Sequence, residues 1–148
     1  MAVTRRRYVD ELAELGVPAE RRQAAVERIA SAVRRTLEDE RGRWLLDARH
    51  SSSANELALT GRIDGIIVSV VIDRTFVDET GTRWIVDYKS SSHEGADLEG
   101  FLASEQERYR PQLERYASLM RRVGPEPIRL GLYFPLLSAW RSWLPAGG

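Results

Sequence analysis

The strongest constraint on the fold is a pair of strand-like segments separated by one tight turn. Residues 66–72 are a run of isoleucine, valine and serine that is too β-branched and too short for a favoured helix. This run predicts a buried strand that continues towards Phe76. Residues 78–81, Asp-Glu-Thr-Gly, are a turn signal, and residues 82–88 return as the antiparallel partner. The sequence therefore predicts a β-hairpin centred near Thr80.

This hairpin brings two aspartates together. If the turn is symmetric about Thr80, Asp73 faces Asp87 on the neighbouring strand. Directly opposed β-carbons lie roughly 4.5–5.5 Å apart, where like charges are destabilising unless a positive charge lies between them. Mg²⁺ fits this need, because proteins typically hold it with one or two carboxylates and complete its shell with water and phosphate. The two-residue period of a strand puts Lys89 on the face of Asp87 and Tyr88 on the other.

Two carboxylates and an ammonium suit metal-assisted hydrolysis of a phosphodiester, in which a lysine holds or deprotonates the nucleophile. The alternative is a solvated hairpin face on which acids and a lysine form ordinary ion pairs. Two features favour the site. The strand around Asp87 is apolar enough to be buried, where unpaired charge is costly, and Lys89 is the only lysine among 22 basic residues. Unlike arginine, lysine is a compact charge with a tunable pKa.

The rest of the chain predicts helices around further strands. Apolar residues at spacings of three and four predict a helix over residues 18–41, and a shorter helix is expected over residues 4–15. Asp64 precedes Gly65 in a turn dipeptide, so we interpret it as a turn residue and not a metal ligand. The other expected elements are short strands at residues 44–46 and 56–60 around a loop at 51–55, a loop at 90–100, a helix from about Glu107, a strand at 128–134, and a covering tail from Pro135 that contains Trp140 and Trp143.

This order of elements predicts an α/β (α+β) fold. The whole chain, residues 1–148, is expected to form one domain, with N-terminal helices in residues 1–42 and an α/β core in residues 43–148.

Composition limits the partners. The 22 basic residues are balanced by 22 acidic ones, so any contact with nucleic acid must be a local patch. The absence of cysteine excludes disulfides and thiolate zinc sites. The sequence has neither a signal-peptide pattern nor an apolar run of bilayer length, so we expect no membrane association and a cytoplasmic location.

The hairpin and the helix after it resemble a known family. Asp73, the triplet from Asp87 to Lys89, and the later pair Gln112 and Tyr116 resemble the RecB-type nuclease domain of the PD-(D/E)xK superfamily. Such domains typically lie at the C-terminus of bacterial recombination helicase-nucleases. The resemblance covers roughly residues 56–143 and implies a restriction-endonuclease-like three-layer sandwich, in which a mixed central sheet is flanked by helices.

The resemblance also implies roles for single residues. Asp73, Asp87 and the backbone carbonyl of Tyr88 become ligands of Mg²⁺, for which Mn²⁺ could substitute, and Lys89 becomes the catalytic lysine. Glu56 stands where the family often has a glutamate before the hairpin.

A DNA-binding surface is implied on the following helix. Gln112 and Tyr116 are four residues apart and share a helix face, with Arg108 one turn earlier and Arg115 adjacent. Such a surface could follow phosphates and offer an aromatic ring to a base. For the tyrosines of this helix, packing in the apolar core is an alternative of equal weight to a role in DNA binding.

One departure from the family concerns histidine. The family has a metal-binding histidine on a helix before the hairpin, whereas the two expected helices before Gly42 contain none, and His50 and His93 fall in predicted loops. We therefore expect the chain to be a C-terminal fragment of a longer protein. In isolation this fragment is expected to bind metal weakly and to cleave poorly.

The function implied is that of a Mg²⁺-dependent deoxyribonuclease, specifically an exodeoxyribonuclease, in bacterial recombination and repair. An ATP-dependent helicase motor in the same polypeptide or complex would feed it single-stranded DNA ends. Two alternatives stay open. The chain could be a non-catalytic, nuclease-like module for DNA binding or assembly of the same larger protein, or an α/β interaction domain whose hairpin charges are accidental.

Overall fold

The computed structural model describes residues 18–93 and 95–147, so the helix expected over residues 4–15 lies outside them. Along the chain the elements are α2 (Ala19–Glu38), α3 (Glu40–Leu45), β1 (Ser51–Ile63), β2 (Ile66–Val77), β3 (Arg83–Tyr88), α4 (Leu98–Met120), β4 (Ile128–Phe134), the short 3₁₀ helix η1 (Pro135–Leu137) and β5 (Ala139–Trp143). None of the described helices is long and apolar enough to cross a bilayer.

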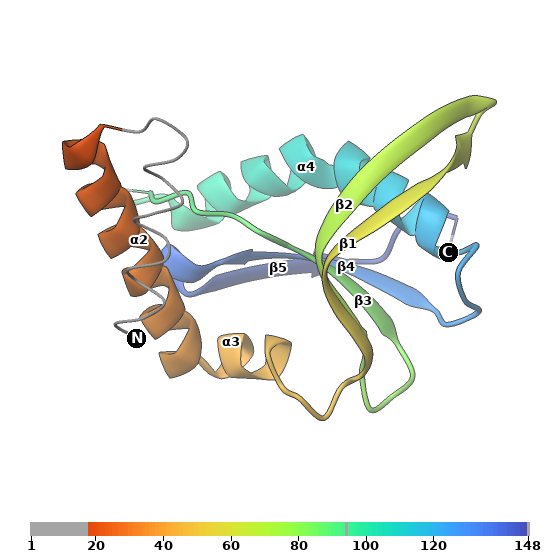
Figure 1. Ribbon diagram of the computed structural model, residues 1–148, viewed down its shortest axis with the longest axis horizontal. Helices are drawn as coiled ribbons and strands as arrows, with labels where there is room; N and C mark the ends of the chain where they lie inside the picture. Colours follow the sequence, from red (N-terminus) through yellow and green to blue (C-terminus); the bar gives the residue numbers. More distant parts are fainter. Residues whose placement is uncertain (1–17, 94, 148) are drawn as a thin grey trace.

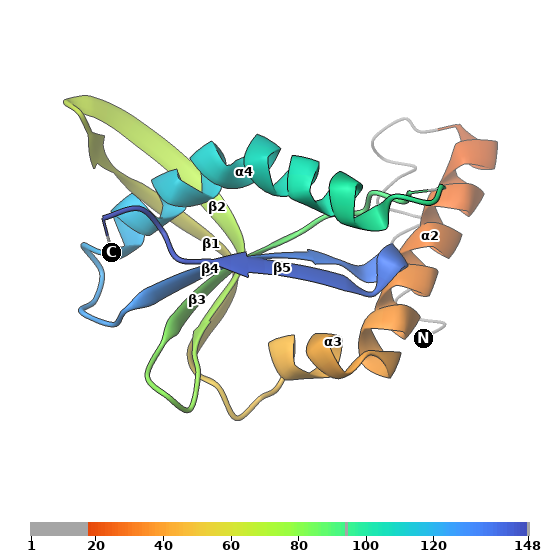
Figure 2. The ribbon, with the colours of Figure 1, turned by 180° about the vertical axis from the view of Figure 1, so that it is seen from behind.

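The five strands form one mixed sheet in the order β1-β2-β3-β4-β5. Only β3 and β4 are parallel, joined by the crossover through α4, and the other neighbours are antiparallel. Helix α4 covers one face of the sheet, while α3 lies against the other and α2 crosses its end (Figures 1 and 2). The expected arrangement of a mixed central sheet between helices is confirmed.

Each face of the sheet has its own apolar core. Under α4, buried side chains from the helix and the strands form one cluster that includes Leu113, Ile85 and Leu132. On the opposite face, Leu45 of α3 packs against Phe76 and other aromatic residues in a second cluster. The strand from Arg83 to Tyr88 therefore runs between two apolar layers, as its composition predicted.

The hairpin of β1 and β2 closes through the predicted turn at Asp64 and Gly65. Both residues have positive φ, 51° and 79°, and Ile63 pairs with Ile66 beside them. Two consecutive positive φ values fit a tight two-residue hairpin turn, which aspartate tolerates and glycine favours. The interpretation of Asp64 as a turn residue is confirmed.

Three of the predicted elements were wrong. Residues 44–46 do not form a strand, because Asp39 accepts a hydrogen bond from the Gly42 backbone N–H at 3.4 Å and caps the short helix α3. Residues 51–55 are not a loop but the start of β1. Their backbone pairs with the neighbouring strand β2, and small polar side chains do not prevent this pairing. The tail after Pro135 contains a fifth strand, in which Trp140 pairs with Tyr133 of β4.

Helix α4 begins nine residues earlier than the expected start near Glu107. The carboxylate of Asp97 accepts a hydrogen bond from the Gly100 backbone N–H at 2.9 Å and caps the first turn. Pro111 lies inside the helix instead of in its first turn, at a usual cost of about 3 kcal/mol. Buried contacts of Leu102 and Leu113 on either side of the proline offset this cost. The strand expected over residues 128–134, by contrast, coincides with β4.

Candidate active site

The register of the central hairpin places Asp73 beside Asp87, as predicted. The β2–β3 ladder pairs Arg74 with Val86 and continues to Val77 with Arg83, so Asp73 and Asp87 come one step beyond its last pair. Asp87 is buried, with 5% of its surface exposed, and the charge of the nearby Asp73 carboxylate acts on its carboxyl group. Two acidic side chains therefore meet where the two strands separate.

A local break in strand β2 sets the position of Asp73. Ile72 packs in the core under α4, yet Arg74, two residues later, donates to the Leu45 carbonyl oxygen on the opposite face at 2.8 Å. Regular alternation would put both side chains on one face. The break lies opposite Glu56, whose φ of 50° is left-handed. Such local distortion costs of the order of 1 kcal/mol and is common beside functional sites.

The backbone ties Asp73 to the end of β3. The Tyr88 N–H donates a hydrogen bond of 2.9 Å to Oδ2 of Asp73. This bond replaces the missing rung of the ladder and fixes the Asp73 carboxylate beside the peptide that links Asp87, Tyr88 and Lys89.

Lys89 is held between an acid and an aromatic ring. Its Nζ lies 2.6 Å from Oδ2 of Asp87 and 3.4 Å from the centroid of the Tyr109 ring, and only 16% of its side chain is exposed. A cation over a tyrosine face in a partly desolvated place gains roughly 1–2 kcal/mol. The sequence weighs core packing and function equally for the tyrosines of this helix, since helical spacing cannot reveal which residue the Tyr109 ring covers.

The pKa of Asp87 is raised to about 6 from 3.8. Burial is the main cause, because the charged form loses its hydration, and the nearby Asp73 carboxylate adds repulsion. The hydrogen bond from Lys89 acts in the opposite direction and offsets only part of this effect. A cation between the two carboxylates would relieve the repulsion.

The raised pKa predicts a pH-dependent stability. The folded protein keeps a proton on Asp87 up to about pH 6, whereas the unfolded chain releases it near 3.8. Without metal, the free energy of unfolding is therefore expected to fall by up to about 3 kcal/mol as the pH rises through this window. Urea unfolding of the wild type and of Asp87→Asn, compared across the window, isolates this contribution. A stability difference between them that stays constant with pH would contradict the prediction.

The predicted helix pair is brought to the site only in part. Gln112 donates from Nε2 to the Tyr116 hydroxyl at 2.5 Å, and Tyr116 is buried. Burial raises the pKa of Tyr116, and the charges of Asp87 and Asp73 add to this effect.

The two arginines of the same helix remain on the exposed surface. Arg108 lies 3.8 Å from Glu105 and packs over the Tyr109 ring, while Arg115 affects Tyr116 only through its charge. Neither is joined to the aspartates by a described contact.

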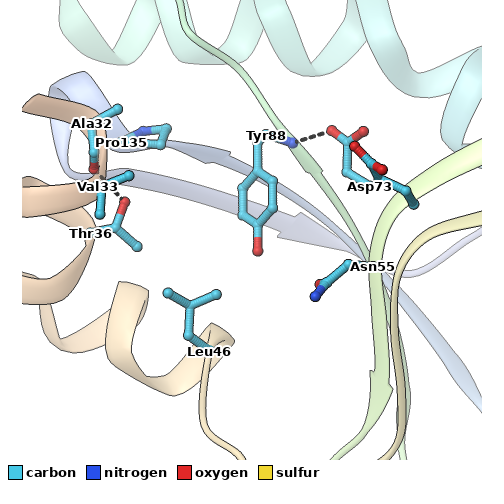
Figure 3. Close-up of a pocket in the computed structure, with 9 residues that line it drawn as sticks. Ala32, Val33, Thr36, Leu46, Asn55, Asp73, Tyr88 and Pro135 are labelled. Carbon is cyan, nitrogen blue, oxygen red and sulfur yellow. Dashed lines mark hydrogen bonds between the residues drawn. The ribbon is translucent and has the colours of Figure 1, made fainter. Parts of the chain in front are cut away.

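A cavity of about 530 Å³ opens beside Asp73 on the face of β3 opposite Lys89 (Figure 3). Glu56 and Tyr88 line it together with residues of α2. Glu56 is exposed and occupies the β1 position facing Asp73, since its neighbours Asn55 and Leu57 pair with Arg74 and Ile72. Glu56 therefore lies on the strand next to Asp73, and the role that the family resemblance implies for it stays a prediction.

The donor set fits a hard divalent cation bound with the help of water and substrate. The described residues contain no group of three acidic, histidine or cysteine side chains that could enclose a metal. Two carboxylates are nevertheless sufficient protein charge for Mg²⁺. Helix α2 contributes only Ala32, Val33 and Thr36 to this region, so it supplies no carboxylate or imidazole.

Both histidines are engaged in packing elsewhere. The His50 ring stacks on Phe76 with centroids 4.0 Å apart, and that of His93 stacks on Phe101 at 4.7 Å. Their interpretation as loop residues that do not bind the metal agrees with these contacts.

Comparison with known proteins identifies the family. A family model described as the PD-(D/E)XK nuclease superfamily matches residues 2–138. The chain belongs to this superfamily. Members of the PD-(D/E)XK superfamily are generally nucleases that use divalent metals, and the mixed sheet described above is consistent with their restriction-endonuclease-like fold.

One solved structure is similar to this chain, at low sequence identity. A solved structure titled "Crystal structure of SSO0001" is similar with a TM-score of 0.45 and 16% identity, over 96% of this chain and 62% of that one. The PD-(D/E)XK chain described here thus spans less than two thirds of that protein. A search of curated proteins gives no match.

Proposed function

We propose that this chain is a metal-dependent nuclease domain that hydrolyses phosphodiester bonds of DNA. The observation that carries the proposal is the meeting of Asp73, Asp87 and Lys89 at the end of the central hairpin. Two neighbouring carboxylates, with an ammonium 2.6 Å from one of them, form a small charged centre inside an otherwise apolar layer. Carboxyl groups whose pKa is perturbed by burial and by a neighbouring charge cluster at functional sites.

Asp73, Asp87 and the Tyr88 backbone carbonyl would hold Mg²⁺, or Mn²⁺ in its place. When bound, the cation would polarise a phosphate and lower the pKa of a coordinated water. Lys89 would orient this water or a phosphate oxygen through its ammonium. The Tyr109 ring and Asp87 keep that ammonium in place, so little side-chain freedom is lost when the substrate arrives.

The exposed face of α4 would guide a DNA strand towards this metal centre. Tyr116 is oriented by Gln112, and the exposed Arg108 and Arg115 would contact phosphates through their charge, with Arg108 exchanging its weak pair with Glu105 for a phosphate. Because the chain has no net charge, this local patch and not a general basic field would bind the DNA.

Metal binding tests the proposal directly. Titration of the wild type with Mn²⁺ in a calorimeter is expected to show one site, and Asp73→Ala or Asp87→Ala is expected to abolish it, because one remaining carboxylate leaves too few fixed oxygen ligands. Asp64→Ala removes an acid in the distant hairpin turn and is the matched control. Unchanged binding in Asp73→Ala would refute the assigned centre.

We further propose the RecB-type context for this domain, with exonucleolytic cleavage of single-stranded ends delivered by a helicase motor in bacterial recombination and repair. The balanced net charge supports a tethered nuclease, since a fused motor could supply the grip on DNA. The competing candidate is a non-catalytic module of the same larger protein. It is favoured by one observation, the lack of a third acidic or histidine ligand among the described residues around Asp73 and Asp87.

A further inference from the structure

The cavity beside Asp73 has one apolar side and one polar side. Ala32, Val33, Leu46 and Pro135 form the apolar side, and Asn55, Glu56 and Asp73 contribute the polar groups (Figure 3). Val33 and Leu46 are 41% and 44% exposed, so their apolar surfaces face open space instead of a packed neighbour. At about 530 Å³ the space is larger than a water cluster needs and falls in the range of small-molecule sites.

The Tyr88 side chain extends into this cavity. Figure 3 shows its ring in the space between α2 and Asn55, with the hydroxyl directed away from strand β3. That hydroxyl oxygen is buried, and no described group forms a hydrogen bond with it. Burying a hydroxyl without a partner usually costs about 1–3 kcal/mol. The ring of Tyr88, which lines the cavity, is the surface that it offers to a ligand.

Neighbouring polar groups offer both donors and acceptors. Asn55 accepts a hydrogen bond of 3.0 Å from Arg74 through Oδ1, which orients its amide, and no described residue accepts from its Nδ2. The Thr36 hydroxyl donates to the Ala32 carbonyl oxygen at 2.7 Å and is buried, so the carboxylates of Glu56 and Asp73 are the acceptors that the cavity offers. Apolar walls combined with such groups fit a flat heteroaromatic ring that has polar atoms along its edge.

The cavity is joined to the acidic pair through a single residue. The Tyr88 N–H bonds Asp73, while the Tyr88 ring lines the cavity. A phosphate bound at Asp73 and Asp87 would therefore place its own sugar and base over this ring. On the bordering helix, Arg28 and Arg35 are exposed and donate to the carbonyl oxygens of Ser90 and Leu136, which keeps positive charge near the same region for adjacent phosphates.

We propose that the cavity is a subsite for one unpaired nucleobase, belonging to the nucleotide whose phosphate lies at Asp73 and Asp87. This inference rests on the proposed nuclease function and specifies its substrate as single-stranded DNA. A base within a duplex is paired and stacked, so it would have to be extruded before it could enter, at a cost of a few kcal/mol.

Abasic substitution tests the subsite without changing the protein's cavity. Short thymidine strands with one abasic position, moved along the strand, are titrated with the Lys89→Ala protein in Mg²⁺, which keeps both aspartates while preventing cleavage. Dissociation constants are measured by fluorescence anisotropy. Stacking on an aromatic side chain is worth about 1–3 kcal/mol per base, so an abasic site at one position is expected to weaken binding about tenfold. Equal binding at every position would overturn the proposal.

Filling the cavity is the complementary test. Val33→Trp, added to the Lys89→Ala protein, is expected to weaken binding of the intact DNA strand about tenfold. It is also expected to remove the penalty of the abasic position, since the indole would occupy the space of the base. Val123→Trp adds the same bulk at a site 60% exposed beyond α4 and is expected to leave binding unchanged. A Val33→Trp protein that still distinguishes the abasic position would show that the base binds elsewhere. The abasic series decides the matter if this variant fails to fold.

Cleavage by the wild type is followed separately, so that the two proposals can fail independently. Cleavage of single strands without any position-dependent abasic penalty would refute the subsite and leave the nuclease intact. A position-dependent penalty in binding, together with no cleavage by the wild type, would refute the nuclease and leave the subsite as part of a DNA-binding module. Equally tight binding of a blunt duplex would contradict the choice of single-stranded DNA.

Discussion

Replacement of Lys89 by alanine is expected to lower the rate of DNA cleavage about a thousandfold while the fold is retained. The ammonium lies 2.6 Å from Asp87 and is the only charged nitrogen in contact with the acidic pair among the described residues. A positioned charge that stabilises the transition state is typically worth 10²–10³-fold or about 3–4 kcal/mol. The rate is measured with labelled single-stranded DNA in Mg²⁺ under single-turnover conditions.

Two further variants make this result interpretable. Lys89→Arg keeps the charge but replaces a compact ammonium by a wide planar group that cannot be deprotonated, so it is expected to be nearly as inactive. Arg62→Ala removes a positive charge from β1 opposite Ile67, six residues or roughly 20 Å along β2 from Asp73, and should cleave normally. Cleavage by Lys89→Ala at the wild-type rate would remove Lys89 from the mechanism.

Substitution of Leu132 by alanine is expected to lower the free energy of unfolding by about 2–5 kcal/mol. Leu132 is fully buried in the core under α4 and pairs with Asp87 across the parallel strands β3 and β4. Its truncation removes apolar contacts and leaves a cavity in a place where neither the sheet nor the helix can easily close it. Urea unfolding followed by tryptophan fluorescence gives the change.

An exposed leucine provides the control for this effect. Leu144 is 62% exposed, so Leu144→Ala is expected to change stability by less than about 0.5 kcal/mol. At low temperature, where most of the Leu132→Ala protein remains folded, its cleavage rate should approach that of the wild type. A loss of stability below 1 kcal/mol would mean that α4 settles onto β4 without leaving a void.

The central hairpin could be predicted from the sequence because its determinants are local. A β-branched run, a turn signal and the rule that facing residues have a constant sum give the register that pairs Arg74 with Val86 and brings Asp73 to Asp87. The strand over residues 128–134 and the turn at Asp64 follow from similarly local signals.

The errors arose where tertiary contacts outweigh such signals. The six-residue helix α3 is too short to show a periodic pattern, and its cap at Asp39 is also stabilised from a distance, since the Tyr133 hydroxyl donates to that carboxylate at 2.8 Å. Likewise, strand β5 exists because β4 offers it an edge. The preference of proline for the first turn predicts a helix start near Pro111, whereas packing on both sides of Pro111 supports a continuous helix.

Within the candidate site, the sequence indicated acids and lysine but not their surroundings. The contact of Lys89 with Tyr109 joins residues on a strand and a helix that are remote in sequence, and nothing in the spacing of either predicts it. The cavity is equally hidden, because its lining comes from α2, the segment after α3, three strands and Pro135. Only the fold brings these positions together.

The position of Tyr88 has a thermodynamic consequence. Its backbone N–H restrains the Asp73 carboxylate, while its ring lines the cavity, so a shift of the residue moves both. If a base and a cation occupy their proposed places, each must change the other's affinity by the same factor, because linkage between two bound ligands is reciprocal. The effect of the metal on DNA affinity and the effect of DNA on metal affinity would then measure the same coupling free energy, which the Tyr88 peptide unit transmits.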